Sequence, residues 1–356
     1  MAKKIIIVGA GIIGSSLAYN LAAKGAAVTV LDANANVGGV ATPNSWSWIN
    51  ASWGHPVDYV KLRMRAMAMW KPLADVHANL MVNWCGGLLW DLEESALLEY
   101  VSRQSGLGYD VRIVDRNEAL QIEPNLLVPP KVAAFAANEG MIDPVAAVQG
   151  FVETAKQFGA IFVGGQKVSQ LVVKSGRVVG VQANGEVHDA DEVVLAGGLG
   201  CMALLKNVGV NLKVDGPAGL LVHSEPTSKM LNGLVMSPEF HVRQTAEGQL
   251  VLGSDFGGTR PGDDPAATAK EILAKLPSMV RGTEKLKMEF YTLGYRPTPI
   301  DGFPVIGRPG GVDGLYVAIT HSGITLAPAV GEFGAEEILK GVRHDLLRPY
   351  HPDRLM

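Results

Sequence analysis

The sequence has only two cysteines among 356 residues, few aromatic residues and no apolar run of bilayer-spanning length. Cys85 and Cys201 stand far apart, which excludes a disulfide-built scaffold and a cysteine-rich zinc or iron–sulfur centre. We expect no metal site. The start of the chain runs from two lysines straight into a short apolar strand, which is too short for a secretory signal. The sequence therefore predicts a protein of the reducing cytoplasm with no integral membrane segment.

The chain also lacks a strong excess of either charge. Lysine and arginine total 31 against 35 acidic residues, and no basic stripe stands out, so a dedicated nucleic-acid binder is disfavoured. Glycine, by contrast, is abundant: 42 residues where a usual share of about 7% would give about 25. Such an excess predicts tight turns and places where the backbone approaches a ligand closely. The length favours two domains.

The first thirty residues carry the clearest pattern. Ile5–Val8 is a short apolar run typical of a buried parallel strand, and Ile12–Lys24 has an apolar stripe at helical spacing. Gly25 is placed to end this helix, and Val28–Leu31 is a second apolar strand that ends at Asp32. Together these segments predict a βαβ unit.

A glycine-rich motif, Gly9-Ala10-Gly11-Ile12-Ile13-Gly14, joins the first strand to the helix. Gly9 permits a tight turn, Gly11 lets the backbone approach a pyrophosphate, and Gly14 lets the helix pack on the strand. The helix N-terminus adds N–H donors and a positive dipole end. Asp32 follows at the expected spacing of about 20 residues, where its carboxylate accepts ribose hydroxyls. The sequence therefore predicts a dinucleotide site.

The chain beyond Asp32 favours FAD over NAD as the dinucleotide. A plain nicotinamide domain would continue with further βα units, whereas this chain passes into Val37–Thr42 and an aromatic-polar loop. Distant glycine-containing segments follow at Ala196–Gly200 and His321–Thr325. Several separated segments that return to one cofactor suit the longer FAD molecule, and an NAD-dependent dehydrogenase stays as the alternative.

Several segments together resemble the D-amino acid oxidase-like family of FAD-dependent amine oxidoreductases, which includes glycine oxidase, sarcosine oxidase and D-amino acid dehydrogenase. The most discriminating is Gly294–Gly307, an Arg-Pro turn followed by Asp-Gly-Phe-Pro-Val-Ile-Gly. The others are Ile5–Asp32, Gly140–Pro144, Ala196–Gly198 and Gly314–Ala329. The resemblance implies FAD-dependent oxidation of an α-amino acid or N-substituted amino acid by hydride transfer, followed by hydrolysis of the imine to the keto acid. A related flavin domain acts on a modified tRNA nucleoside, and this second alternative is disfavoured by the acidic charge balance.

The expected fold is α/β, with a discontinuous Rossmann-like FAD-binding domain and a mixed, largely antiparallel-sheet substrate domain. We assign residues 1–80, 140–212 and 297–356 to the first domain. Residues 81–139 and 213–296 form the second domain, whose sheet is expected to cover the flavin with the substrate pocket between the two.

By this resemblance, Arg296 is the side chain that holds the substrate carboxylate. A planar guanidinium can grip both carboxylate oxygens, although a structural ion pair beside the proline is the alternative. The resemblance also places small hydroxyls near the flavin and pyrophosphate, one strand against the adenine, and a helix start beside the flavin ring. With the glycine-rich motif, the expected FAD-binding residues are Gly9, Gly11, Ile12, Ile13, Gly14, Asp32, Thr42, Ser45, Val168, Ala196, Gly197, Ser322, Gly323, Ile324 and Thr325.

Departures from the family pattern are informative. Sarcosine oxidases attach their flavin through a cysteine near the Arg-Pro turn, and this chain has none there, so we expect non-covalent FAD. Apolar Val251 stands where sarcosine oxidase has an oxygen-activating lysine, which disfavours a sarcosine oxidase and efficient use of oxygen. Oxygen and a quinone both stay open as the electron acceptor. Trp46, Trp48 and Trp53 replace basic residues after the first glycine-rich loop.

Further pocket candidates come from strand alternation. His241 and Arg243 lie two apart on an expected strand, so both face one side. His241 is a candidate for substrate contact, or else a satisfied or exposed hairpin residue. Arg243 is a second anion-binding group, or else an exposed charge on a sheet edge.

Three more side chains complete the candidates. His321 precedes the glycine loop and either orients the flavin or packs behind it. Trp48, with Trp46, either lines the substrate pocket or belongs to the core. Tyr291 is a weaker candidate for a hydrogen bond to substrate. Substrate identity, stereochemistry and oligomeric state stay open.

Overall fold

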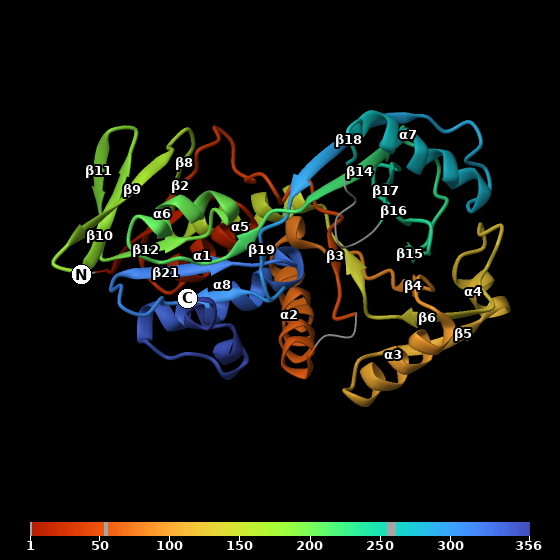
Figure 1. Cartoon of the computed structure of the whole chain (residues 1–356), viewed down its shortest axis with the longest axis horizontal. Helices are drawn as coiled ribbons and strands as arrows, with labels where there is room; N and C mark the ends of the chain where they lie inside the picture. The colour runs from red at the N-terminus through yellow and green to blue at the C-terminus, as the bar shows by residue number, and fades with distance from the viewer. Residues whose placement is uncertain (1, 53–55, 255–260) are drawn as a thin grey trace.

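The computed structural model describes residues 2–52, 56–254 and 261–356, so Trp53 lies outside the described residues. Figure 1 shows two lobes, with the N- and C-termini in the first. That lobe contains a six-stranded sheet in the order β20-β21-β12-β1-β2-β8, parallel except for the β20–β21 pair. Its strands are β1 (Lys4–Val8), β2 (Ala27–Leu31), β8 (Ile161–Val163), β12 (Glu192–Leu195), β20 (Val305–Gly307) and β21 (Leu315–Ile319). The predicted parallel βαβ unit is confirmed.

Four long helices accompany this sheet: α1 (Ile12–Ala23), α2 (Val57–Val76), α5 (Pro144–Gln157) and α8 (Gly323–Lys340). Local sequence fixes their ends. Asp143 caps α5 by accepting a hydrogen bond from the N–H of Ala146 at 2.6 Å, as the Asp-Pro pair predicts. Helices α1 and α8 cross closely because residue 331 is glycine; a Cβ there would lie 2.2 Å from Ser16 Oγ.

The second lobe is built on an eight-stranded sheet in the order β18-β14-β17-β16-β15-β4-β6-β5. All neighbours are antiparallel except β15 and β4, which confirms the predicted mixed, largely antiparallel sheet. The strands are β4 (Gly87–Leu89), β5 (Val111–Asp115), β6 (Val132–Ala136), β14 (Ala218–Ser224), β15 (Leu234–Met236), β16 (His241–Gln244), β17 (Leu250–Gly253) and β18 (Met288–Tyr295). Three helices, α3 (Glu94–Gly106), α4 (Arg116–Ile122) and α7 (Pro265–Lys275), belong to this lobe (Figure 1).

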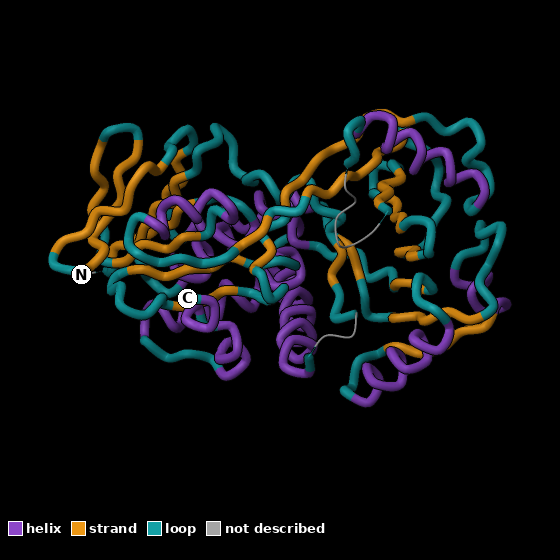
Figure 2. Tube along the Cα trace, in the orientation of Figure 1, coloured by secondary structure: helices purple, strands orange, loops and turns teal. Residues whose placement is uncertain are grey.

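Short elements complete the chain (Figure 2). A three-stranded antiparallel sheet extends the first lobe, and two-stranded pairs β3–β7 and β13–β19 join segments that are distant in sequence. The remaining strands are β3 (Trp48–Ile49), β7 (Gly140–Met141), β9 (Val168–Lys174), β10 (Arg177–Ala183), β11 (Glu186–Asp189), β13 (Val214–Asp215) and β19 (Thr298–Pro299). The remaining helices are α6 (Met202–Lys206) and the 3₁₀ segments Ala78–Leu80, Gly198–Cys201, Leu276–Ser278, Asp345–Tyr350 and Pro352–Leu355.

Two features of the second lobe differ from the pattern read in the sequence. The sequence pattern of residues 213–223 predicts one strand, but the segment forms β13 and β14, separated at Gly216-Pro217, because proline has no N–H for a strand ladder. Helix α4 was missed; Asp115 caps it by accepting from the N–H of Glu118 at 2.9 Å. The two sheets draw their strands from the predicted sets of ranges, whereas the domain boundaries themselves stay a prediction.

Within the described ranges, no helix combines the length and the apolar character needed to cross a membrane.

Gly14→Ala is expected to destabilise the protein by about 2 kcal/mol or more, because the new Cβ would lie 1.9 Å from the carbonyl oxygen of Gly9. Urea unfolding of the purified protein measures the loss. Gly106→Ala is the matched control, since its Cβ would meet nothing within 4 Å. Equal stability of the two variants would contradict the close contact between α1 and the strand turn.

Candidate active site

The glycine-rich turn after β1 has the conformation that its motif predicts. Gly9 has φ of +105°, and a Cβ there would lie 2.6 Å from the Cα of Gly197. At Gly14 a Cβ would lie 1.9 Å from the Gly9 carbonyl oxygen. Both positions therefore require glycine, one for the turn and one for helix packing.

The loops after β1 and β2 contact each other at the carboxyl ends of the strands. The buried carboxylate of Asp32 accepts hydrogen bonds from the N–H groups of Ala10 at 2.7 Å and Asn34 at 2.8 Å. Thr42 Oγ1 accepts from the N–H of Ile12, at the start of α1, at 3.2 Å. A Cβ at Gly39 would lie 3.3 Å from the Cα of Gly11. A carboxylate, a helix N-terminus and a backbone cradle without side chains are what a dinucleotide requires, so these residues fit the predicted group.

Other expected cofactor residues lie around the same edge. Ala196 follows β12 and donates its N–H to the carbonyl of Val8 at 2.9 Å, which sets it beside the glycine turn. Ser45 Oγ accepts from the N–H of Ser47 at 3.0 Å within the loop after Thr42. Val168, half-buried, begins β9 in the three-stranded sheet.

A second helix N-terminus approaches the first. Ser322 precedes α8 with a left-handed φ of 60°, and its Oγ lies 2.9 Å from Nδ1 of His321. A Cβ at Gly323 would lie 3.5 Å from Ile12 Cγ2, so the starts of α1 and α8 are close together. The first N–H groups of α8 have no acceptor within their own helix, and the dipole there favours negative charge.

Side-chain alternation sorts the pocket candidates onto two faces of the large sheet. Val242, Leu250 and Leu252 pack in the outer hydrophobic cluster with α7, so His241 and Arg243 point to the inner face. Strand β16 lies between β17 and β15, and both candidates are buried, at 4% and 6% exposure. The alternatives of an exposed hairpin histidine and an exposed edge arginine are therefore wrong.

Tyr291 lies on the other face. Its side chain packs against the outer cluster, and the alternation of β18 directs it away from the side that His241 occupies. We therefore leave it out of the pocket proposed below.

Two glycines make room for the two polar candidates on the inner face. A Cβ at Gly219 would lie 3.1 Å from Nη2 of the half-buried Arg296, and one at Gly253 would lie 2.4 Å from Nε2 of His241. Burial, with the nearby charge of Arg296, lowers the pKa of His241 to about 3. A neutral imidazole thus lies within the electrostatic reach of a cationic guanidinium.

The tryptophan pair, Trp46 and Trp48, joins this inner face to α8. The Trp46 ring is 4.6 Å from that of His241 and 5.9 Å from that of Trp48, both edge-on, and its Nε1 donates to the Val251 carbonyl at 3.1 Å. The carbonyl of Trp48 accepts from Thr325 Oγ1 at 3.1 Å. Both indoles are buried in the main hydrophobic core. The two tryptophans also connect His241, which contacts Trp46, with the start of α8, which contacts Trp48.

A buried carboxylate that sequence reasoning missed holds Trp48. Glu139 accepts hydrogen bonds from Trp48 Nε1 at 2.8 Å and from the hydroxyls of Ser52 and Tyr109. Burial raises its pKa to about 7 despite these donors. No motif signals this residue, because its partners are up to 91 positions away.

Comparison of the sequence with known protein families identifies the class of enzyme. A model described as the FAD dependent oxidoreductase family, DAO, matches residues 4–337. The chain belongs to this family. It is similar to glycine oxidase of Bacillus licheniformis, 27% identical over 94% of this chain and 92% of the relative. Glycine oxidase of Pseudomonas putida is also 27% identical, over 99% of both chains. The structure of L-proline dehydrogenase from P. horikoshii superposes with a TM-score of 0.90 and 24% identity over 99% of this chain and 97% of that one.

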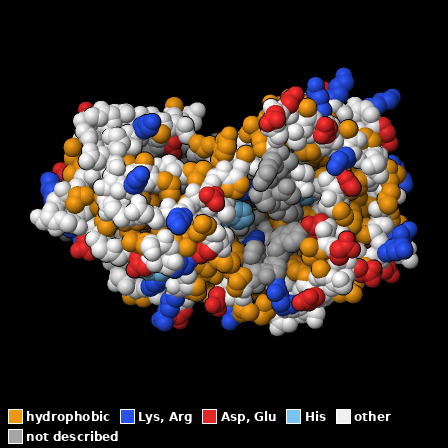
Figure 3. All heavy atoms as spheres, viewed as in Figure 1, with side chains coloured by type: hydrophobic (Ala, Val, Ile, Leu, Met, Phe, Trp, Pro, Cys, Tyr) orange, Lys and Arg blue, Asp and Glu red, His pale blue; other side chains and the backbone are white. Residues whose placement is uncertain are grey.

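Membership of the DAO family confirms three expectations: the protein is an enzyme, an oxidoreductase, and dependent on FAD. It overturns the NAD-dependent alternative. Figure 3 shows that the surface of this DAO-family protein is indented where the two lobes meet.

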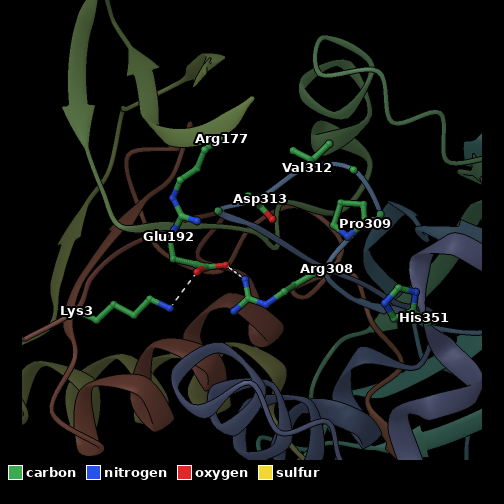
Figure 4. Close-up of a pocket in the computed structure, with 11 residues that line it drawn as sticks. Lys3, Arg177, Glu192, Arg308, Pro309, Val312, Asp313 and His351 are labelled. Carbon is green, nitrogen blue, oxygen red and sulfur yellow. Dashed lines mark hydrogen bonds and ion pairs between the residues drawn. The ribbon is translucent and has the colours of Figure 1, made fainter. Parts of the chain in front are cut away.

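A separate pocket of about 520 Å³ lies away from this region (Figure 4). It is at the amino ends of the parallel strands, opposite the glycine-rich turn, where ligands of open α/β sheets do not usually bind. Glu192, 2% exposed, forms ion pairs there with Lys3 at 3.0 Å and with Arg308. These charges satisfy one another, so we treat the pocket as structural.

Removing the Glu139 carboxylate tests its role in the core. Glu139→Ala leaves three buried donors without their acceptor and is expected to cost about 3 kcal/mol or more, at about 1–3 kcal/mol each. Glu139→Gln is the milder control. The amide oxygen of glutamine can accept from Trp48 Nε1, and the hydroxyls of Ser52 and Tyr109 can rotate to accept from the amide N–H groups. Chemical unfolding measures both, and equal losses would contradict the account.

The raised pKa of Glu139 predicts a pH dependence. The folded protein holds this proton above the ordinary pKa of 4.5, so the stabilisation is complete below that pH and is lost as pH rises through about 7. The unfolding free energy of wild type relative to Glu139→Gln should therefore be larger at pH 5 than at pH 8. No change, or the opposite sign, would show that Glu139 is ionised in the fold.

Proposed function

We propose that this protein oxidises the amine of an α-amino acid or N-substituted amino acid to an imine, which water then hydrolyses to the keto acid. FAD, when bound, supplies the acceptor for the two electrons and the hydrogen that leave the α-carbon as hydride. The nitrogen lone pair forms the C=N bond as the C–H bond breaks, and one N–H proton passes to solvent. Such a reaction needs no side-chain base when the amine is neutral.

The observation that carries the proposal is the place of Arg296. Its guanidinium lies over Gly219 on the inner face of the sheet, within the electrostatic reach of His241. From there it would hold the substrate carboxylate with two N–H donors and fix the position of the α-carbon.

His241 supports the same arrangement. Because its pKa is lowered to about 3, the imidazole carries no charge at neutral pH and does not repel the substrate amine. The buried Trp48, with Trp46 against His241, would line the site with apolar surface and exclude water.

The first lobe provides the residues that would hold FAD. Asp32 would meet the ribose, and the loops around Gly11 and Thr42 would meet the pyrophosphate. The start of α8, from Ser322 to Thr325, would lie beside the flavin, with His321 orienting it through the contact with Ser322. Its dipole favours the negative charge that the reduced cofactor carries.

The relatives support the reaction class. Two are named glycine oxidase and one L-proline dehydrogenase, so their names span a primary and a secondary amine and both an oxidase and a dehydrogenase. Oxygen and a quinone both remain candidate acceptors for this chain.

Anaerobic mixing with a panel of amino acids tests the function. At least one α-amino or N-substituted amino acid should bleach the visible flavin absorbance, and admission of air then reports whether oxygen restores it. A yellow protein that no amino acid bleaches would contradict the proposal. Salt-dependent RNA binding by such a protein would instead favour the tRNA-directed alternative.

Arg296→Met should lower kcat/KM for the best substrate by roughly 30- to 5,000-fold, which corresponds to about 2–5 kcal/mol of lost transition-state stabilisation, because the carboxylate loses a charge-assisted partner. Flavin content should be retained. Arg348→Met, which removes a surface arginine paired with Asp345, is the control and should change kcat/KM little. Unchanged kcat/KM in Arg296→Met would exclude Arg296 as the carboxylate anchor.

A further inference from the structure

A second arginine on the inner face forms no ion pair with any acidic residue in the described ranges. Arg243 is 6% exposed, and its Nη1 contacts the sulfur of Met141 at 3.9 Å. Its Nε has no hydrogen-bond acceptor among the residues that the structure describes. The acidic groups that act on it, Asp143 and Glu247 among them, do so at longer range than an ion pair.

A buried, unpaired guanidinium is costly. Desolvation of an ion costs several kcal/mol unless a partner and hydrogen bonds compensate. Burial lowers the pKa of Arg243 only to about 10, so the side chain stays charged at neutral pH. The other buried arginine, Arg63, shows the usual solution, because its guanidinium donates to the backbone and side-chain oxygens of Asn50.

The sheet register places Arg243 next to the proposed substrate site. His241 pairs with Gly253, and Arg243 pairs with Val251, whose carbonyl accepts from Trp46. Residues 241 and 243 therefore lie on the same face of β16, about 6.6 Å apart along the strand. Arg296 is the residue after β18, and its guanidinium lies over Gly219. Its positive charge contributes to the lowered pKa of His241. The inner face therefore carries two cations: Arg296, whose charge acts on the neutral His241, and Arg243, two residues further along β16.

We infer that the substrate is an amino acid with a second carboxylate, which Arg243 binds while Arg296 holds the α-carboxylate. This inference rests on the proposed function. Two guanidiniums and an uncharged His241 match two carboxylates, whereas an amino acid with a neutral side chain leaves one buried cation without a partner. The class includes side-chain dicarboxylic amino acids and N-carboxyalkyl amino acids.

Comparison of each dicarboxylic amino acid with its amide removes one negative charge while the shape of the molecule stays nearly the same. Aspartate against asparagine and glutamate against glutamine, as both enantiomers, and iminodiacetate against its monoamide are mixed anaerobically with the holoenzyme. The rate constant for flavin bleaching divided by Kd should favour the best acid over its amide by at least about 30-fold, the scale of a lost buried charge contact.

The variants assign this preference to one residue. In Arg243→Met the ratio of acid to amide should fall to near one, and Arg243→Lys should keep part of it, because the charge remains without the planar fork. Arg348→Met should keep the wild-type ratio. A ratio that Arg243→Met leaves unchanged, or a wild-type preference for amides, would overturn the inference and leave the proposed function standing.

A binding measurement covers the remaining cases. Succinate cannot be oxidised as an amine, so its binding is followed through the change in the flavin spectrum of the holoenzyme. Its Kd should be at least about ten-fold lower than that of its monoamide, and Arg243→Lys should reduce this difference. If no amino acid bleached the flavin, the proposed function and the substrate class would both fail, whereas succinate binding would still show whether Arg243 binds a carboxylate. Equal affinity for succinate and the monoamide would overturn it.

Discussion

Trp48 links the start of α8 to the large sheet, and the position of one against the other depends on it. Its carbonyl accepts from Thr325 in the first turn of α8, while its indole N–H donates to the buried Glu139, three residues beyond the end of β6. Trp46 stacks edge-on between Trp48 and His241. Because these contacts are buried and directional, they fix the inner face of the sheet against the start of α8 more strictly than apolar packing would.

The charge pattern of the inner face follows from burial. Desolvation and the charge of Arg296 keep His241 neutral, whereas Arg243 stays charged despite its burial. A site with two guanidiniums attracts carboxylates. Because His241 is uncharged, it adds no third positive charge that would repel the substrate amine. Glycine at position 253 leaves room for His241, since a Cβ there would lie 2.4 Å from its Nε2, and a Cβ at position 219 would make a tight contact of 3.1 Å with Nη2 of Arg296.

Sequence reasoning succeeded where chemistry is local. The turn at Gly9, the cap at Asp143 and the alternation of His241 and Arg243 each depend on a few neighbouring residues, and each has the predicted geometry. It failed where partners are distant. Glu139 was missed because Trp48 meets it only through the fold, and Tyr291 was considered for the pocket because its strand, whose alternation turns it outward, was not recognised.

Amino-acid oxidation by this protein depends on the proposed role of Arg296, which would hold the substrate carboxylate between the large sheet and the start of α8. The most direct test is a crystal structure of the FAD-loaded enzyme with a bound, unreactive carboxylate analogue of the best substrate. The account predicts two N–H···O contacts of about 2.7–2.9 Å between the Arg296 guanidinium and one carboxylate. A carboxylate bound elsewhere, with Arg296 turned away to a protein acid, would contradict it.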